Sequence, residues 1–246
     1  MKAFLIAFAI VVLGSLAAIA AVSLNRGAAH SEMTHETRAA SGFHRLEISG
    51  AADVTLVQGA PEGVSIDAPA SARVLTEVRN GTLVVETEDG RPWQWFSGRR
   101  AGRTPRVTIN LRELDTIEAA GAVKIGAESL RSTDLRLDLS GAGSFRVRDL
   151  QATTLKLEGS GATKIDIAGK VARQEVGLSG AGWYQAGNLT SDDASVRVSG
   201  AGKALVNARR ALTVDISGAG KVEYFGDPQL KQTISGVGKV TRRQPS

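Results

Sequence analysis

The chain has 246 residues, of which 42% are hydrophobic and only 4% aromatic, so a core must be built mainly from Val, Leu, Ile and Ala. The absence of cysteine excludes disulfides, thiolate metal sites, a cysteine nucleophile and an acylated lipoprotein anchor. The formal net charge of +5 favours a solvated basic surface, with a polyanion partner as the alternative.

Residues 1–24 predict an export segment. Met1-Lys2 provides a positive end, and Ala3 to Leu24 follow without a single charge. Ala18-Ile19-Ala20 offers a cleavage site after Ala20, but the uncharged run is also long enough to span a bilayer as an anchor helix. A cleaved signal peptide and an uncleaved anchor both remain open, and both predict that the rest of the chain is exported.

Residues 25–42 are polar, small and weakly patterned, which predicts a linker. The three histidines, His30, His35 and His44, lie in it or next to it. His30 and His35 could share a metal ion, but no further ligand follows at a suitable spacing. We therefore expect no metal site.

Residues 43–88 predict N-terminal coils or a cap. Leu46 to Leu56 alternate between apolar and polar residues around Ser49-Gly50-Ala51, which indicates two strands joined by a corner. Val64-Ser65-Ile66 and Leu83-Val84-Val85 add strands, and Asn80-Gly81 is a turn signal.

Residues 89–106 break the alternation, and Pro92, Gly98 and Gly102 favour a loop. Two interpretations stay open. The aromatic side chains could plug the joint between cap and coils, or the loop could contact an anionic envelope partner through arginine and tryptophan. The candidate binding residues are Arg91, Trp93, Trp95, Phe96, Arg99, Arg100 and Arg103.

Residues 107–246 carry an internal repeat. Ser140-Gly141-Ala142-Gly143 recurs with variants, and from Ala120 onward the copies follow one another after 20, 20, 19, 20, 18 and 18 residues. Apolar and polar residues alternate on both sides of each copy, which indicates two half-buried strands per coil. Coils of about 18–20 residues can enclose a core only when stacked, so the pattern predicts an all-β fold, a β-solenoid.

The repeated tetrapeptide predicts a sharp corner, because glycine reaches backbone angles closed to other residues. We expect the corner alanines, such as Ala201, to be too tightly packed for a larger side chain, and Gly159 to mark a bulge. Lys203, Lys221 and Lys239 should form a solvent-facing row. The structural corner residues are Ser140, Gly141, Gly143, Gly161, Ser179, Gly180, Gly182, Ser199, Gly200, Gly202, Ser217, Gly218, Gly220, Gly236 and Gly238.

Motifs that resemble catalytic sites are incomplete. No histidine follows His44, so the repeated Ser-Gly has no base for a nucleophilic serine. The Gly-Lys pairs lack the Ser or Thr of a phosphate-binding loop, and Asp192-Asp193 is a lone acidic pair. We expect no catalytic residues, no cofactor and no nucleic-acid partner.

Three segments resemble a known family, the putative auto-transporter adhesin head GIN domain. They are Phe43 to Val57, Asn80 to Val85, and Val107-Thr108-Ile109 leading into Leu114 to Ile117. The Ser-Gly-Ala-Gly coils continue the resemblance, which covers about residues 43 to 240. It implies a right-handed parallel β-helix on a secreted or envelope protein, and it carries over no catalytic residue.

Three functions remain in competition. The first is a non-catalytic envelope or surface module that binds protein or polysaccharide. The second is a structural or regulatory periplasmic domain held at the inner membrane by Ala3 to Leu24, and the third is a polysaccharide-active β-helix enzyme. Envelope polysaccharide, anionic lipid or a surface protein are the partners considered, and the periplasm, the inner membrane and the cell surface are the locations.

Overall fold

The computed structural model describes residues 33–59, 61–70, 72–88 and 104–244, and these form fourteen strands and no helix. Within these ranges, nothing helical has the length and apolar character to cross a membrane. The predicted export segment, residues 1–24, lies outside the described residues.

The strands fall into an N-terminal group, a group of long strands and a C-terminal group. The first group is β1 (Met33–Arg38), β2 (Arg45–Gln58), β3 (Gly63–Pro69), β4 (Arg73–Arg79), β5 (Thr82–Glu88) and β6 (Arg106–Leu111). The long strands are β7 (Thr116–Gly141), β8 (Ser144–Gly161), β9 (Lys164–Gly180), β10 (Trp183–Gly200) and β11 (Lys203–Gly218). The last are β12 (Lys221–Phe225), β13 (Gln229–Gly236) and β14 (Lys239–Arg242).

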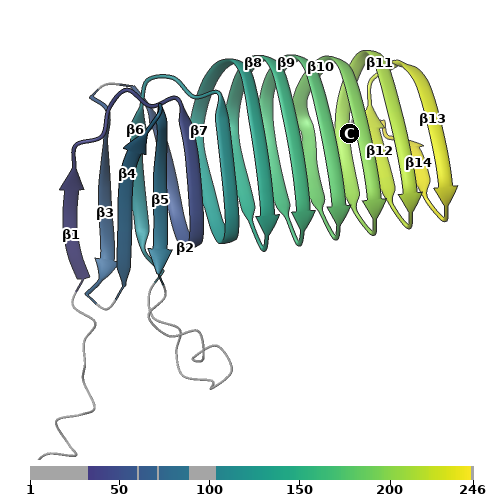
Figure 1. The fold of residues 1–246 in the computed structure, drawn as a ribbon. Coiled ribbons are helices and arrows are strands. Elements are labelled where there is room, and N and C mark those ends of the chain that lie inside the picture. The colour runs from purple at the N-terminus through teal and green to yellow at the C-terminus, as the bar shows by residue number, and fades with distance from the viewer. Residues whose placement is uncertain (1–32, 60, 71, 89–103, 245–246) are drawn as a thin grey trace, which may run out of the picture. The chain divides into compact units, whose positions relative to one another are not determined.

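The long strands stack in parallel, in the order β2, β7, β8, β9, β10 and β11 (Figure 1). Each of β8 to β11 begins just after one corner and ends at the next, so one strand supplies most of one coil. Equivalent residues pair in register, as Ser140 does with Ser160 and Ser160 with Ser179. The stack is the parallel β-solenoid that the repeat predicts.

Columns of apolar side chains fill the interior of the stack. One column holds Leu137, Leu157, Val176, Val196 and Val214, none of which is more than 3% exposed. Burial of each such side chain contributes about 1.5–3 kcal/mol. The period-two alternation of the sequence thus places one face of every strand in a continuous core.

Close packing at the corner occurs at glycine and not at alanine. Gly200 has a φ of 120°, and a Cβ there would lie 2.6 Å from the carbonyl oxygen of Gly180 in the preceding coil. Gly202 is buried, and a Cβ there would lie 3.0 Å from Val198 Cγ1. Ala201 is exposed, as are the other corner alanines, so the expectation of a tight alanine is wrong. The alanine side chain points to solvent because the two glycines make the close approaches.

Gly159 is not a bulge, because it pairs in register with Leu139 and Leu178. Its lack of a side chain makes room for Thr163, which lies 2% exposed at the corner position that Gly143 holds one coil earlier. A Cβ on Gly159 would approach Thr163 Oγ1 to 2.8 Å. The volume lost at residue 159 is therefore filled from residue 163.

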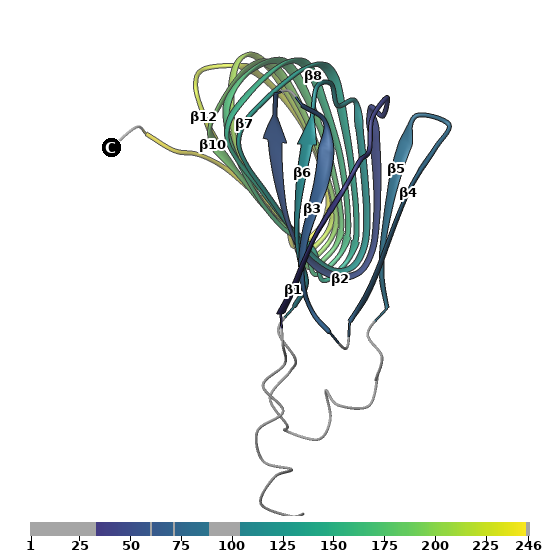
Figure 2. The ribbon, with the colours of Figure 1, turned by 90° about the vertical axis from the view of Figure 1, so that its left-hand side faces the viewer.

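The N-terminal end of the core is covered by two groups of strands, both paired to β2 (Figure 2). On one side β5 pairs with β2 in parallel and forms an antiparallel hairpin with β4. On the other side β6 pairs with β2, and β3 and β1 follow in antiparallel order. The hairpin turns at Asn80 and Gly81, both with positive φ, as the sequence predicts.

One sequence expectation differs from this end of the structure. Residues 33–38 lie within the predicted linker but form β1. Their backbone pairs antiparallel with β3, from Met33 opposite Pro69 to Arg38 opposite Val64. Residues 43–88, predicted as N-terminal coils or a cap, contain β3 and β4, which run antiparallel to their neighbours. Backbone pairing holds β1, whose exposed side chains give no apolar alternation to detect.

The C-terminal end is closed by a polar coil. Gln232 in β13 pairs with Val214, and Arg242 in β14 pairs with Tyr224, so polar residues replace apolar ones in two interior columns. Arg242 forms an ion pair with Asp227 at 3.0 Å. Solenoids need such polar terminal repeats because the end of the core would otherwise face water.

Candidate functional site

The corners form one edge of the stack, where the long strands end (Figure 1), and one face of the solenoid lies on each side of this edge. The pre-corner face consists of the outward residues of the strand segments that end at a corner, such as Asp138. The post-corner face consists of the outward residues of the segments that begin just after one, such as Lys164. Both faces are parallel sheets whose rungs are about 4.8 Å apart.

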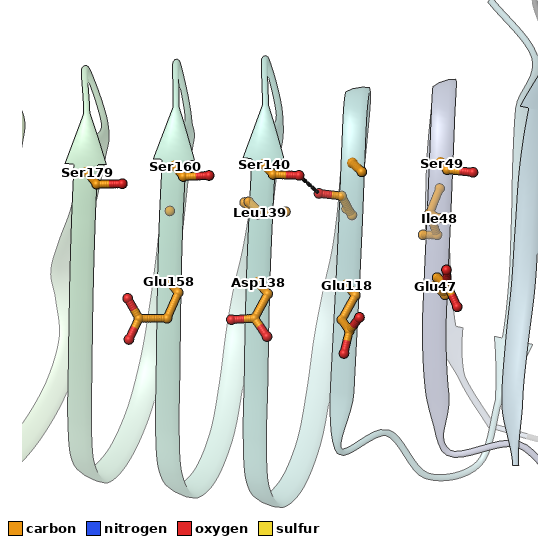
Figure 3. Close-up of a pocket in the computed structure, with 13 residues that line it drawn as sticks. Glu47, Ile48, Ser49, Glu118, Asp138, Leu139, Ser140, Glu158, Ser160 and Ser179 are labelled. Carbon is orange, nitrogen blue, oxygen red and sulfur yellow. Dashed lines mark hydrogen bonds between the residues drawn. The ribbon is translucent and has the colours of Figure 1, made fainter.

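A column of four carboxylates lies on the pre-corner face. Glu47 pairs with Glu118, and Asp138 pairs with Glu158 on the following rungs. Figure 3 shows their side chains in one row below a row of corner serines. Together they line a shallow groove of about 380 Å³.

An arginine neutralises part of the negative charge in this groove. Arg136 Nε donates a hydrogen bond of 2.7 Å to Asp138 Oδ2, and this contact raises the pKa of the guanidinium. Stacked carboxylates at strand spacing repel one another, and the arginine offsets part of this repulsion. Among the described residues, no group of three or more His, Cys, Asp or Glu side chains is placed to hold a metal ion.

Among the described residues, no histidine contacts a corner serine. Ser140 Oγ donates to the carbonyl oxygen of Ala119 at 3.4 Å, a contact back to the preceding coil. His35 contacts Asp67 at 2.7 Å and His44 lies 3.8 Å from Asp115. Both histidines belong to the cap and interact with carboxylates, so the described residues do not assemble a serine nucleophile with a histidine base.

The post-corner face carries a different column. It holds one residue of each successive coil, which pair in register: Lys124, Ser144, Lys164, Trp183, Lys203, Lys221 and Lys239. We call this set the lysine–tryptophan column. Backbone hydrogen bonds fix each rung at the same point, as in Trp183 N to Thr163 O at 2.7 Å and Lys203 N to Gly182 O at 2.8 Å.

Trp183 interrupts the lysines near the middle of the column. Its side chain is 47% exposed, and Lys164 Nζ lies over the ring at 5.8 Å from the centroid. This is a cation–π contact on a solvent-facing sheet. Sequence reasoning predicted the lysine row but missed this residue, although Trp183 follows Ser179 at the spacing by which Lys203 follows Ser199.

The lysines of the column differ in their partners. Lys221 Nζ contacts Glu223 at 2.8 Å, and this hydrogen bond, together with the charge of Arg243, holds the pKa of Glu223 below its usual value. Lys164 and Lys203 form no ion pair with any described residue. The central part of the column therefore presents its positive charge to solvent.

A buried polar chain crosses the interior beneath this column. The Tyr184 hydroxyl donates to Gln174 Oε1 at 2.9 Å, Gln174 Nε2 donates to Ser191 Oγ at 2.7 Å, and Ser191 Oγ donates to the Asn207 carbonyl at 2.9 Å. Burial raises the pKa of Tyr184 far above its usual value, so the phenol stays protonated. Each group has a partner, which fixes the register of three coils without an opening to a ligand.

The remaining predicted site residues are the candidate binding loop, the acidic pair and the corners. Arg91, Trp93, Trp95, Phe96, Arg99, Arg100 and Arg103, the candidate binding loop, lie outside the described residues. Asp193 of the lone acidic pair is bound by the Arg210 guanidinium, whose hydrogen bonds lower the pKa of the carboxyl group. The corner residues serve the backbone packing described above.

Comparisons with known proteins agree with this architecture. The family model described as "Putative auto-transporter adhesin, head GIN domain" matches residues 42–228, as the resemblance predicted. No curated protein matches the chain.

Several solved structures share the fold. A putative adhesin from Bacteroides fragilis NCTC 9343 is 19% identical, with a TM-score of 0.78 over 86% of this chain and 97% of that one. A putative lipid binding protein from Parabacteroides distasonis ATCC 8503 is 18% identical, with a TM-score of 0.68 over 87% and 98%. A putative adhesin from Parabacteroides merdae ATCC 43184 is 16% identical, with a TM-score of 0.66 over the same shares. At these identities the likeness establishes the fold.

Proposed function

Because the chain belongs to the family described as putative auto-transporter adhesin, head GIN domain, we propose that it is a non-catalytic, exported envelope module that binds a partner along its solenoid surface. The binding is adhesin-like, to a polysaccharide or a protein. The module acts at the periplasmic or outer side of the envelope.

The observation that carries this proposal is the lysine–tryptophan column. A rigid parallel sheet presents cations on successive rungs around one exposed tryptophan, with Lys164 and Lys203 free of ion pairs to described residues. Repeated flat surfaces of this kind suit an extended partner, whose own repeats can contact several coils at once. The net charge of +5 adds a long-range attraction for an anionic partner.

A second function is favoured by the sequence of residues 1–24. If this apolar run stays uncleaved, the solenoid is a structural or regulatory domain held at the inner membrane. Mass spectrometry of the protein from its native cells distinguishes the two cases, because cleavage after Ala20 removes the first twenty residues. A reporter at the C-terminus that works only in the periplasm should be active in both.

Binding is tested with the exported chain and washed cell envelopes. We expect retention on envelopes that decreases as salt is raised, because surface charges are screened. The same mixtures should release no new reducing sugar ends over hours. Absence of retention by a folded protein, or steady release of reducing ends, would overturn the proposal.

A further inference from the structure

We infer that Lys164, Trp183, Gln185 and Lys203 form a binding site for a linear acidic polysaccharide that lies along the solenoid axis. This inference rests on the proposed envelope function and names its ligand class. The four residues come from the starts of three successive long strands, β9, β10 and β11.

The pairing of the strands fixes the geometry of the site. Trp183 pairs with Lys164 on one side and with Lys203 on the other, so the ring has a lysine one rung away in both directions. The two lysines are thus separated by two strand spacings, about 10 Å. Because the backbone positions are set by the ladder, the site exists without a change of fold.

Gln185 lies beside the tryptophan on the same face. It is two residues along β10, so its side chain points to the same side of the sheet. It pairs with Asp166 and Leu205, and Asp166 is engaged by Arg146 at 3.4 Å. The half-buried amide is a donor and acceptor next to the ring, positioned for the hydroxyl groups of a bound ligand.

This combination matches an acidic sugar chain. The apolar C–H face of a pyranose stacks on the exposed part of the indole, which Lys164 Nζ contacts from the neighbouring rung, and the sugar hydroxyl groups form hydrogen bonds with the Gln185 amide. Carboxylate or sulfate groups on the neighbouring sugars meet the two lysines, which are compact point charges on flexible stems. The rung spacing is close to the length that one pyranose adds to an extended chain, so successive sugars can follow successive coils.

A lipid surface fits the site less well. Trp183 is the one large exposed hydrophobic residue among the described members of the column, and the nearby apolar side chains of this face, Leu205 and Phe225, are half-buried. Proteins that lie on membranes bury a broad apolar face together with their basic residues. One exposed indole beside two half-buried apolar side chains, among lysines and a glutamine, is not such a broad apolar face.

The test measures binding of the full exported chain to polygalacturonate, with a neutral galactan as the control polymer. We expect salt-sensitive binding to polygalacturonate only. Trp183→Ala should raise the dissociation constant about tenfold, which corresponds to a loss of about 1.4 kcal/mol in binding free energy. Trp183→Tyr should keep most of the affinity, because a smaller aromatic face remains.

The charges are tested separately. Lys164→Ala combined with Lys203→Ala should weaken binding about fivefold or more at low salt and reduce its salt dependence. Lys156→Ala is the matched control, because Lys156 is an exposed lysine of the same solenoid on the pre-corner face. It should bind like the wild type. The substituted side chains face solvent, and circular dichroism checks that each variant keeps its fold.

Three results would overturn the inference. The first is wild-type binding that Trp183→Ala and the double lysine variant leave unchanged; the envelope function would then survive with its site elsewhere. The second is binding to vesicles of phosphatidylglycerol but not to polygalacturonate, which would assign the column to a membrane. The third is no binding to either probe by a protein that is retained on envelopes. Failure of envelope retention itself would instead reject the proposed function.

Discussion

The middle coils and the C-terminal coil use the same strand positions but differ in what fills them. Leu212 in β11 and Leu230 in β13 pair directly, yet Leu212 is fully buried and Leu230 is 39% exposed. Each middle coil has a neighbour above and below, whereas the last one has a neighbour on one side only. The comparison teaches that stability in this fold comes from the interfaces between coils more than from any single coil.

The N-terminal end solves the same problem differently. There the core is covered by the β4–β5 hairpin and by β6, β3 and β1, so Leu83 and Val107 are fully buried although they lie at the end of the stack. At the C-terminal end, the residues of β13 are exposed to solvent, and several of them are polar. Antiparallel strands cover one end, and composition protects the other.

The largest expected loss of stability distinguishes a middle coil from the C-terminal coil. Leu212→Ala should destabilise the protein by about 2–5 kcal/mol, because it removes a fully buried side chain and leaves a cavity. Leu230→Ala on the adjacent rung should cost much less, since much of that side chain is already in water. Urea unfolding of both variants measures the difference, and equal losses would contradict the role of coil interfaces.

The corner offers the next comparison. Gly200→Ala should cost about 1–3 kcal/mol from backbone strain, with a further cost from the contact to Gly180 O. Ala201→Leu, one residue on, should change stability by less than about 0.5 kcal/mol, because exposed positions tolerate substitution. Thermal unfolding of the pair provides the measurement. A large loss of stability for Ala201→Leu would show that the alanine, and not only the glycine, is tightly packed.

The exchange of volume between residues 159 and 163 predicts a double-mutant effect. Gly159→Leu alone should cost about 1–3 kcal/mol, because the new side chain meets Thr163 and overfills the core. Adding Thr163→Gly should recover most of this loss, since the pair then matches Leu139 and Gly143 one coil earlier. Additive losses in urea unfolding would show that the two positions do not share one space.

The sequence predicted the coils well because their physics repeats. Leu137 and its four buried equivalents precede five successive corners and form one column, so the alternation and the spacing carry the same information several times. The wrong predictions concern features that occur only once or that depend on which way a side chain points. The exposure of Ala201 depends on which corner residue faces inward. The glycine at position 159 is explained only by the neighbouring Thr163 side chain, which fills its space.

The candidate site was harder to predict for the same reason. Lysine at the fourth residue after the corner serine repeats and was recognised as a row, whereas Trp183 occupies that position in one coil only. β1 is held by backbone pairing with β3, and its exposed side chains leave no apolar signal. Single events of this kind become visible only when the strands are placed side by side.

The most direct test of the binding account is the NMR signal of the Trp183 indole N–H, assigned by its loss in Trp183→Tyr. We expect this signal to shift on titration with polygalacturonate, to reach a plateau, and to stay in place with neutral galactan. The indole signals of Trp93 and Trp95 in the same spectra report on the alternative binding loop, and we expect them to stay in place. A Trp183 signal that does not move while the protein binds polygalacturonate would contradict the lysine–tryptophan column as the binding site.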